Sequence, residues 1–269
     1  MGRLGYTDTP GIRTLNDDGQ FQPLPHRIED LEGIPIAQVA CGDMHSLAAG
    51  VGGQLYVWGS SELGRLGIPA HTLEKMKNQD GAVSKPILLE SALDGHFVTK
   101  IAGTSDHAFA ITAEGALFGW GGSSWGSLGL GDVELSVTDY EEKYQPTPLR
   151  LETLKDVKIK EVACDDCHGL ALSSTGEIYA WGQASYGRLG LPPGLVALSS
   201  TKDEYGDEYL GTPQKIPAME GVNVISIAAG RAHNMAISDR GNPNPNPNPN
   251  RHFITWPSQI EMSFSGCSP

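Results

Sequence analysis

The sequence has few cysteines, a shortage of basic residues and no long apolar run. Only four of 269 residues are cysteines, at irregular spacing, which excludes a disulfide-stapled secreted scaffold. Lysine and arginine number 19 against 32 acidic residues, and the net charge of −13 argues against nucleic acid and anionic membrane surfaces as direct partners. No apolar run approaches roughly 18 residues, and the amino terminus is not a charged-then-apolar segment, so neither a transmembrane helix nor a secretory signal is predicted. We expect an intracellular setting, in the cytoplasm or nucleus.

The chain contains a long repeat that is identified by two short sequence motifs, called its marks below. An aromatic run ends in Trp-Gly at Trp58, Trp120 and Trp181, and each is followed by Gly-x-Leu-Gly. The tryptophans are 62 and 61 residues apart (120 − 58 and 181 − 120). Upstream of each lies Ala-x-x-x-x-His, at His45, His107 and His168, with a fourth copy at His233. A period of this length predicts a repeated supersecondary unit.

Each unit contains short β-type runs separated by Gly, Pro, Asn or Asp, without a helical period. In the second unit the runs are 98–102, 107–111, 116–120 and 148–151. Four short strands per repeat are typical of one propeller blade. The sequence therefore predicts an all-β, β-propeller fold with about three to four blades, an incomplete ring, and units that start near residues 34, 97, 157 and 222.

The two ends of the chain differ from the complete units. The first residues, Gly2–Gly5, match the end of a blade, while 242–250 alternates Asn and Pro where an aromatic strand should follow. Alternating prolines remove ladder donors. We therefore predict propeller repeats over 1–241 and a low-complexity, disordered tail over 242–269. An open arc of this kind should expose blade faces and an unpaired edge near Ala236.

Strand parity predicts which loops share a face. If the first strand of a unit rises, the turn before each histidine and the long insert after each Trp-Gly strand lie on the same side. This places inserts 68–85, 130–145 and 191–212 together, on the side where repeat proteins usually bind.

A residue type that recurs at one place in every unit indicates a structural role. Histidines could form a metal or general-base set, but their regular recurrence favours structural hydrogen bonding, and the glycines recur for backbone geometry rather than as phosphate cradles. The predicted structural repeat residues are His45, His107, His168, His233, Trp58, Trp120, Trp181, Gly64, Gly67, Gly126, Gly129, Gly187 and Gly190.

The paired marks, Gly/Ala-x-x-His with an apolar strand and then Tyr/Phe-x-Trp-Gly with Gly-x-Leu-Gly, resemble the repeats of the regulator of chromosome condensation family. The resemblance covers about residues 34–241 and the first few residues, and implies a propeller that normally has seven blades. Some members of that family catalyse nucleotide exchange on a nuclear small GTPase. Others are adaptors, ubiquitin-ligase accessory domains, β-lactamase inhibitors or a plant UV-B photoreceptor, so the fold alone does not choose a function.

The sequence gives little support to three specific functions, which are haem or zinc binding, ultraviolet sensing and hydrolysis. Cys164-Asp-Asp-Cys167-His168 has the spacing of a haem attachment motif and half of a zinc site, but Cys164 aligns with Cys41 and His168 with the other histidines, leaving only Cys167 extra. The photoreceptor often has Trp two residues before this histidine, where the present chain has Asp43, Ser105, Asp166 and Arg231. No hydrolytic triad or carboxylate pair stands out. We predict no cofactor, no bound metal and no catalytic residues.

The inserts carry the clearest charge signal, with net charges of −4 over 130–145 and −3 over 191–212. Such runs are often only solvated, yet the tyrosines among them are typical of protein interfaces. Asp106-His107 is the pair that most resembles the partner-facing rim of the exchange factors. We predict a protein-interaction module, not an enzyme, that binds a basic protein surface; the alternative is guanine-nucleotide exchange on a small GTPase. The candidate partner-binding residues are Asp106, His107, Asp139, Glu141, Glu142, Asp203, Glu204, Asp207 and Glu208.

Overall fold

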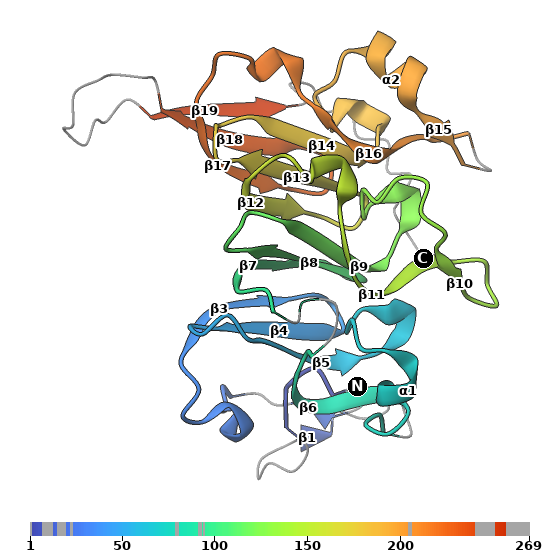
Figure 1. Ribbon diagram of the computed structural model, residues 1–269. Helices are drawn as coiled ribbons and strands as arrows, with labels where there is room; N and C mark the ends of the chain where they lie inside the picture. The colour runs from blue at the N-terminus through green and yellow to red at the C-terminus, as the bar shows by residue number, and fades with distance from the viewer. Residues whose placement is uncertain are drawn as a thin grey trace.

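In the computed structural model, four antiparallel β-sheets stack on one another along the chain, from the blue sheet of β3 and β4 to the red and orange sheet of β17–β19 (Figure 1). The structure describes residues 2–6, 13–14, 20–21, 24–78, 81–90, 93, 95–203, 206–239 and 251–256. Each of these sheets is one blade; its main strands pair in sequence order, and the short β10 and β15 lie on the outer edges of two of the sheets. The predicted all-β propeller fold is confirmed.

The four blades have matching strands. Blade 1 contains β3 (Ile36–Cys41), β4 (His45–Gly50), β5 (Leu55–Ser60) and β6 (Ala82–Leu88). Blade 2 contains β7 (Val98–Gly103), β8 (His107–Thr112), β9 (Leu117–Gly122), β11 (Lys143–Arg150) and the short β10 (Ser136–Val137). Blade 3 contains β12 (Ile159–Cys164), β13 (His168–Ser173), β14 (Ile178–Gln183), β16 (Glu208–Lys215) and β15 (Thr201–Lys202). Blade 4 contains β17 (Val224–Ala229), β18 (Asn234–Asp239) and β19 (Arg251–Trp256).

Short helices and one hairpin lie outside the blade ladders. The two α-helices are α1 (Ala70–Leu73) and α2 (Pro193–Ser199), and the hairpin pairs β1 (Arg13–Thr14) with β2 (Gln20–Phe21). A single-turn 3-10 helix, η2 (Glu29–Leu31), precedes blade 1, and others follow third or fourth strands: η3 (Glu62–Gly64), η4 (Ser124–Gly126), η5 (Glu152–Leu154), η6 (Ser185–Gly187) and η7 (Pro217–Met219).

The core lies between the blades, and the second strands of the two middle blades are covered on both sides. Every residue of β8 and β13 is buried. Bulky residues of this strand pack toward the next blade: the rings of Phe109 in blade 2 and Trp181 in blade 3 meet edge to face at 5.8 Å. Phe109 and Trp181, both fully buried, thus fill the space between blades 2 and 3.

Trp-Gly and Gly-x-Leu-Gly are the two halves of one contact between consecutive blades. The indole N–H groups of Trp58, Trp120 and Trp181 donate to the carbonyls of Arg3, Arg65 and Ser127, at 3.0, 3.1 and 2.7 Å. Each acceptor belongs to the Gly-x-Leu-Gly segment of the preceding unit. The last glycine of that segment has positive φ, and a Cβ on Gly67 would lie 3.0 Å from the Trp120 ring nitrogen. These tryptophans therefore lie in the layer between consecutive blades.

Blade 4 corrects the predicted boundary at residue 241. Residues 251–256, assigned to the tail, form β19, which pairs with β18 from Asn234↔Trp256 to Asp239↔Arg251. Trp256 is buried in the third-strand position and packs on Gly190, as Trp120 packs on Gly67. Eleven residues (240–250) therefore connect β18 to β19, where four (51–54) connect β4 to β5. The Asn-Pro tract and the remainder of the predicted tail, 257–269, lie outside the described residues.

The described part of the arc is open at both ends. Blade 1 and blade 4 lie at opposite ends of the stack, and the ring does not close (Figure 1). The unpaired edge predicted near Ala236 is wrong in its place, because Ala236 pairs with both β17 and β19, so that β19 is the outermost strand among the described residues. None of the helices in the described ranges is long and apolar enough to cross a membrane.

Candidate protein-binding face

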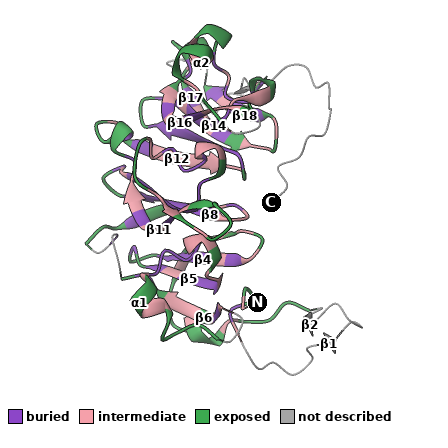
Figure 2. Cartoon of the chain, turned by 90° about the vertical axis from the view of Figure 1, so that its right-hand side faces the viewer, coloured by how far each residue is buried: buried purple, intermediate pink, exposed green. Residues whose placement is uncertain are grey.

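One face of the arc gathers the turns before the histidine strands and the long inserts, as the strand parity predicts. We call it the insert face; it is on the right of Figure 1 and toward the viewer in Figure 2, with α1 and α2 upon it. Hydrogen bonds join these two sets of loops: Ser60 donates its backbone N–H to the carbonyl of Met44, and Gly122 to that of Asp106. The indole N–H of Trp125, in η4 of blade 2, donates to Asp203 in the third insert at 2.8 Å.

Three of the four repeat histidines are buried and structural. His45, His107 and His168 are at most 1% exposed, and Thr104 and Asp165 hold the Nδ1 atoms of the latter two at 3.0 and 2.6 Å. Burial lowers the pKa of His45 to about 3, with the nearby Arg65 charge acting in the same direction. Burial likewise lowers the pKa of His107 to about 4. The rings of His45 and His107 are therefore neutral at neutral pH.

His107 had also been predicted to contact a partner, and its burial corrects that assignment. Its ring is 1% exposed and packs edge to face on Phe109 at 5.5 Å. The fourth histidine, His233, differs in being exposed, because blade 4 has no following blade to cover it in the described structure.

Asp106 lies at the surface but is tied to the preceding blade. Its Oδ1 atom is 2.8 Å from the guanidinium of Arg65, whose side chain is only 5% exposed, against 45% for Asp106. Burial raises the pKa of Asp106; Arg65 opposes this, and repulsion from Asp166, Glu142 and Asp43 adds to it. The Arg65–Asp106 ion pair thus joins blades 1 and 2 within a field of negative charge.

Those neighbours define an acidic rim that crosses three blades. We give this name to Asp43, Asp106, Glu142 and Asp166, of which all but Asp106 are exposed. Asp166 also accepts the backbone N–H of Ser105 at 3.0 Å, so it bridges blades 2 and 3. Within the described residues, the Arg231 position of blade 4 is the one place in this row of turns that carries the opposite charge.

The second insert projects a hairpin tip next to the rim. Thr138 and Glu142 close the tip between β10 and β11, and Glu141 has a positive φ of 65°. Tyr140 is 87% exposed, and Asp139 and Glu141 beside it are also exposed. An exposed tyrosine between two carboxylates is suited to contact with a protein surface, since Tyr combines an apolar ring with a hydrogen-bonding hydroxyl.

Two acidic side chains of the third insert that were predicted to bind a partner, Asp203 and Glu208, contact other residues of this chain. Asp203 accepts from the Trp125 indole N–H and from the backbone N–H of Asp207, and Glu208 lies 3.6 Å from Lys202. Asp207 is exposed, while Glu204 lies outside the described residues. Asp203 therefore ties the third insert to η4 of blade 2, whereas Asp43, Glu142 and Asp166 of the rim and Asp139 and Glu141 of the hairpin tip are exposed.

Cys164, Cys167 and His168 do not converge on an ion. His168 is held by Asp165 and by Asn234, whose Oδ1 atom is 2.7 Å from Nε2, and burial raises the pKa of the Cys164 thiol. No group of three or more His, Cys, Asp or Glu side chains in the described ranges is placed to hold a metal.

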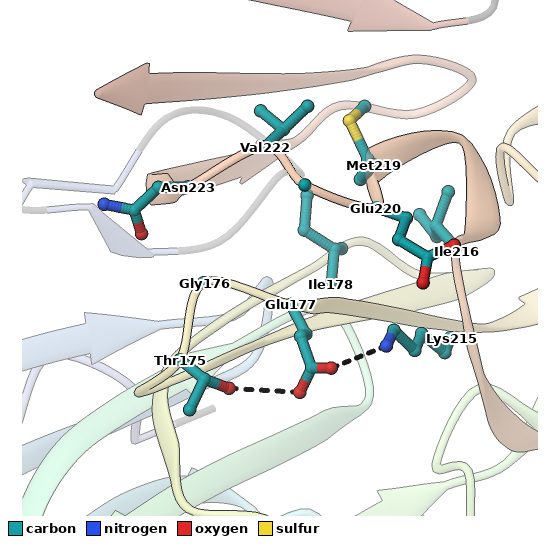
Figure 3. Close-up of a pocket in the computed structure, with 11 residues that line it drawn as sticks. Thr175, Gly176, Glu177, Ile178, Lys215, Ile216, Met219, Glu220, Val222 and Asn223 are labelled. Carbon is teal, nitrogen blue, oxygen red and sulfur yellow. Dashed lines mark hydrogen bonds and ion pairs between the residues drawn. The ribbon is translucent and has the colours of Figure 1, made fainter. Parts of the chain in front are cut away.

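The opposite face has two cavities between blades. One, of about 400 Å³, is lined by Ile178, Met219 and Val222, with the Lys215–Glu177 ion pair at 2.6 Å on its wall (Figure 3). The other, of about 610 Å³, occupies the matching place between blades 1 and 2. None of the predicted partner-binding residues lines either cavity, and the Lys215–Glu177 pair satisfies its own charges.

Sequence reasoning missed two members of the acidic rim, Asp43 and Asp166. Both stand two residues before a repeat histidine, at the position where the photoreceptor often has Trp. The residues at that position, Asp, Ser, Asp and Arg in chain order, were the signal in the sequence that could have identified the rim. Side chains at the same position of every repeat line up on one face when the blades stack.

Comparison with known proteins agrees with the fold. The model of the regulator of chromosome condensation repeat matches residues 1–49, 52–111, 114–172 and 175–237. The chain is 32% identical over 243 residues to the ultraviolet-B receptor UVR8 of Arabidopsis thaliana, covering 90% of this chain and 45% of the receptor. It is 33% identical over 213 residues to the human protein named Probable E3 ubiquitin-protein ligase HERC4, covering 79% of this chain and 17% of that protein.

Among solved structures, Prp20p from Saccharomyces cerevisiae superposes with a TM-score of 0.64 at 24% identity, over 86% of this chain and 51% of Prp20p. The chain thus spans about half the length, or less, of the relatives it matches. These relatives share the repeat but carry different activities in their names.

Proposed function

The chain belongs to the regulator of chromosome condensation repeat family, and from this premise we propose that it is a protein-interaction module that binds a basic protein surface through the insert face. The observation that carries the proposal is the acidic rim: carboxylates from three successive blades lie close enough for Asp43, Glu142 and Asp166 each to raise the pKa of Asp106. Like charges kept together are costly unless a partner neutralises them, and they attract such a partner over about 10 Å at 0.1 M ionic strength.

Neutralising the rim should slow association. In the variant Asp43→Asn/Glu142→Gln/Asp166→Asn, we expect about a tenfold lower association rate with a basic partner captured by the wild-type chain, because electrostatic steering acts mainly on encounter. The difference should shrink as salt is raised from 50 to 500 mM, as expected for screened charges. Stopped-flow or surface-based kinetics would measure both effects.

The matched control removes the same charge from the opposite face. Glu90, Glu152 and Glu220 are exposed and follow the fourth strands, so Glu90→Gln/Glu152→Gln/Glu220→Gln changes net charge equally, away from the rim. If the two triple variants bind at the same rate, the rim only provides solubility.

The geometry gives less support to the alternative function, guanine-nucleotide exchange on a small GTPase, than to the interaction module. Of the pair that suggested it, His107 is buried and Asp106 is paired with Arg65. An exchange factor must bind the empty state of its GTPase more tightly than the loaded one, because only differential affinity accelerates release.

We therefore expect no acceleration of labelled GDP release when the chain is mixed with a loaded nuclear-type small GTPase. Release is followed over time with excess unlabelled nucleotide, and spontaneous release is the baseline. Acceleration that is lost on Asp106→Asn and retained on Glu220→Gln would replace the interaction-module proposal with the exchange function.

A further inference from the structure

The cavity between blades 1 and 2, on the face opposite the inserts, combines buried and exposed apolar side chains. Four of its lining residues are buried: Leu55, Leu89, Leu93 and Val98. Leu88 and Phe97 line it as well, yet they are 39% and 46% exposed. Single exposed apolar side chains are ordinary on a protein surface, but two on one cavity of about 610 Å³ extend its apolar lining into solvent.

The other repeats show that stacking does not require apolar residues at these two places. The residues aligned with Leu88 pair with the third strand of their own blade, as Tyr56↔Leu88, Phe118↔Arg150 and Tyr179↔Lys215. The residues aligned with Phe97 stand directly before the first strand of the next blade, and are Lys158 and Asn223. Since Arg, Lys and Asn at these places leave blades 2, 3 and 4 stacked, stacking does not explain Leu88 and Phe97.

The basic residues aligned with Leu88 are held within the chain. Lys215 lies 2.6 Å from Glu177 on the wall of the cavity between blades 3 and 4 (Figure 3), and Arg150 donates to the carbonyl of Lys155 at 3.1 Å. Gln54 takes the place of Glu177 in blade 1, because both accept the last backbone N–H of their turn, from Gly50 and Ser173. Blade 1 therefore has glutamine and leucine where blade 3 has an ion pair.

Negative charge borders the apolar surface. Among the described residues that line the cavity, the ionisable side chains are Glu90, which is exposed, and His96. The His96 ring packs on Phe118 at 5.4 Å, and its Nδ1 atom is 3.8 Å from a carboxylate oxygen of Glu114, whose side chain is 63% exposed. An occupant that brings a cation beside an apolar group is therefore complementary to this cavity.

We propose that this cavity is a second protein-docking site, which binds a short partner segment that carries a large apolar side chain next to a lysine or arginine. The apolar side chain enters between Leu88 and Phe97, and the cation lies toward Glu90 and Glu114. A second copy of this chain is a poorer occupant, because its net charge of −13 brings like charge to the same place. The site lies on the face opposite the acidic rim and does not rest on the proposed function.

A display library of random peptides, about nine residues long, is the probe, selected on the immobilised wild-type chain. We expect the enriched peptides to carry Leu, Met or Phe within about three positions of Lys or Arg, as an anchor with a neighbouring cation requires. Titration of a synthetic peptide from this pool should shift the methyl NMR signals of Leu88, Leu89 and Leu93.

The repeat itself supplies a variant that closes the site without changing the net charge. Gln54→Glu/Leu88→Lys/Phe97→Asn, the blade 3 variant, introduces the residue types that Glu177, Lys215 and Asn223 supply at the same places. Because blade 3 folds with these residues and the three side chains that change are exposed, the fold should be retained. The enriched peptides should bind at least about tenfold more weakly, since the apolar contact is lost and the new lysine repels their cation.

Two further variants keep the result interpretable. Phe97→Asn alone changes one exposed side chain and should give part of the same loss, which tests the site even if the triple variant does not fold. Leu198→Asn, at a side chain that is 87% exposed on the insert face, is the matched control and should leave binding unchanged. Peptides that lose affinity for Asp43→Asn/Glu142→Gln/Asp166→Asn and keep it for the blade 3 variant belong to the insert face, and count for the proposed function and against the second site.

Three results would overturn the proposal. These are a selected pool without enrichment of apolar residues beside basic ones, enriched peptides that bind the wild-type chain and the blade 3 variant equally, and methyl shifts confined to residues away from the cavity. A wild-type dimer that the blade 3 variant does not form would also overturn it, because the cavity would then be assigned to a second copy of the chain.

Discussion

Replacing Gly121 with Ala is expected to lower the free energy of unfolding by about 3 kcal/mol or more. Gly121 has φ +102°, and a Cβ there would lie 2.3 Å from the carbonyl oxygen of Asp106 and 2.7 Å from the Cα of His107. Both contacts are to backbone of the neighbouring strand, which cannot move without breaking the β8–β9 ladder. Gly59 and Gly182 occupy the same position in blades 1 and 3, with the same clash at 2.3 Å.

Gly95→Ala is the matched control for this prediction. Gly95 also has positive φ, +81°, but a Cβ there would meet nothing within 4 Å. It should cost only the conformational penalty of about 1–2 kcal/mol. Urea denaturation of both variants measures the difference; equal losses would mean that conformational strain alone, and not the close approach of two strands, requires glycine after each tryptophan.

Acidification is expected to destabilise the fold strongly through His45 and His107. Their pKa values of about 3 and about 4 lie below the value of about 6.5 of an unfolded chain, so the folded state requires neutral rings. Their contribution to stability is complete above about pH 6.5 and is lost as the pH falls toward 4. With two protons taken up on unfolding, stability should fall by up to about 2.7 kcal/mol per pH unit in that window.

Unfolding midpoints in urea at pH 7.5, 6.5, 5.5 and 4.5 test this dependence. His107→Gln should remove about half of the slope, and His233→Gln, at an exposed ring, is the matched substitution for comparison. Asp106 acts in the opposite sense at lower pH, because its raised pKa lets the folded state hold a proton more readily. A stability that is the same at pH 7.5 and 5.5 would contradict the assignment of neutral, buried histidines.

The repeat marks predicted the fold well because they are the contacts that join blades. Trp120 and Gly67 recur because every pair of consecutive blades uses the same contact, an indole against a positive-φ glycine, so the same residue types appear once in each unit. β19 was missed for the same cause. Its Trp256 is followed by Pro257 instead of Gly and is preceded by an Asn-Pro tract, so the local marks are absent while the stacking position is filled.

The candidate site was less predictable because it arises from stacking. Asp43, Asp106 and Asp166 are about 60 residues apart in sequence and meet only when three turns align on one face. The separate role of Asp106 depends on Arg65, and the burial of His107 depends on the blade above it. Charge counts over the inserts point to the insert face, but they could not distinguish Asp203, which accepts a hydrogen bond from Trp125 of blade 2, from Glu142, which is exposed in the rim.

The eleven-residue connection between β18 and β19 shows how loosely the length of that turn is specified. In the chain-entropy description, closing a loop of eleven residues instead of four costs only about 0.9 kcal/mol more. The strand after it still aligns with β18 over six residue pairs and still places an indole against Gly190. A blade can therefore accept added sequence between its second and third strands at small cost in chain entropy. The long inserts of variable length lie on the insert face, and the opposite face can also accept a longer loop.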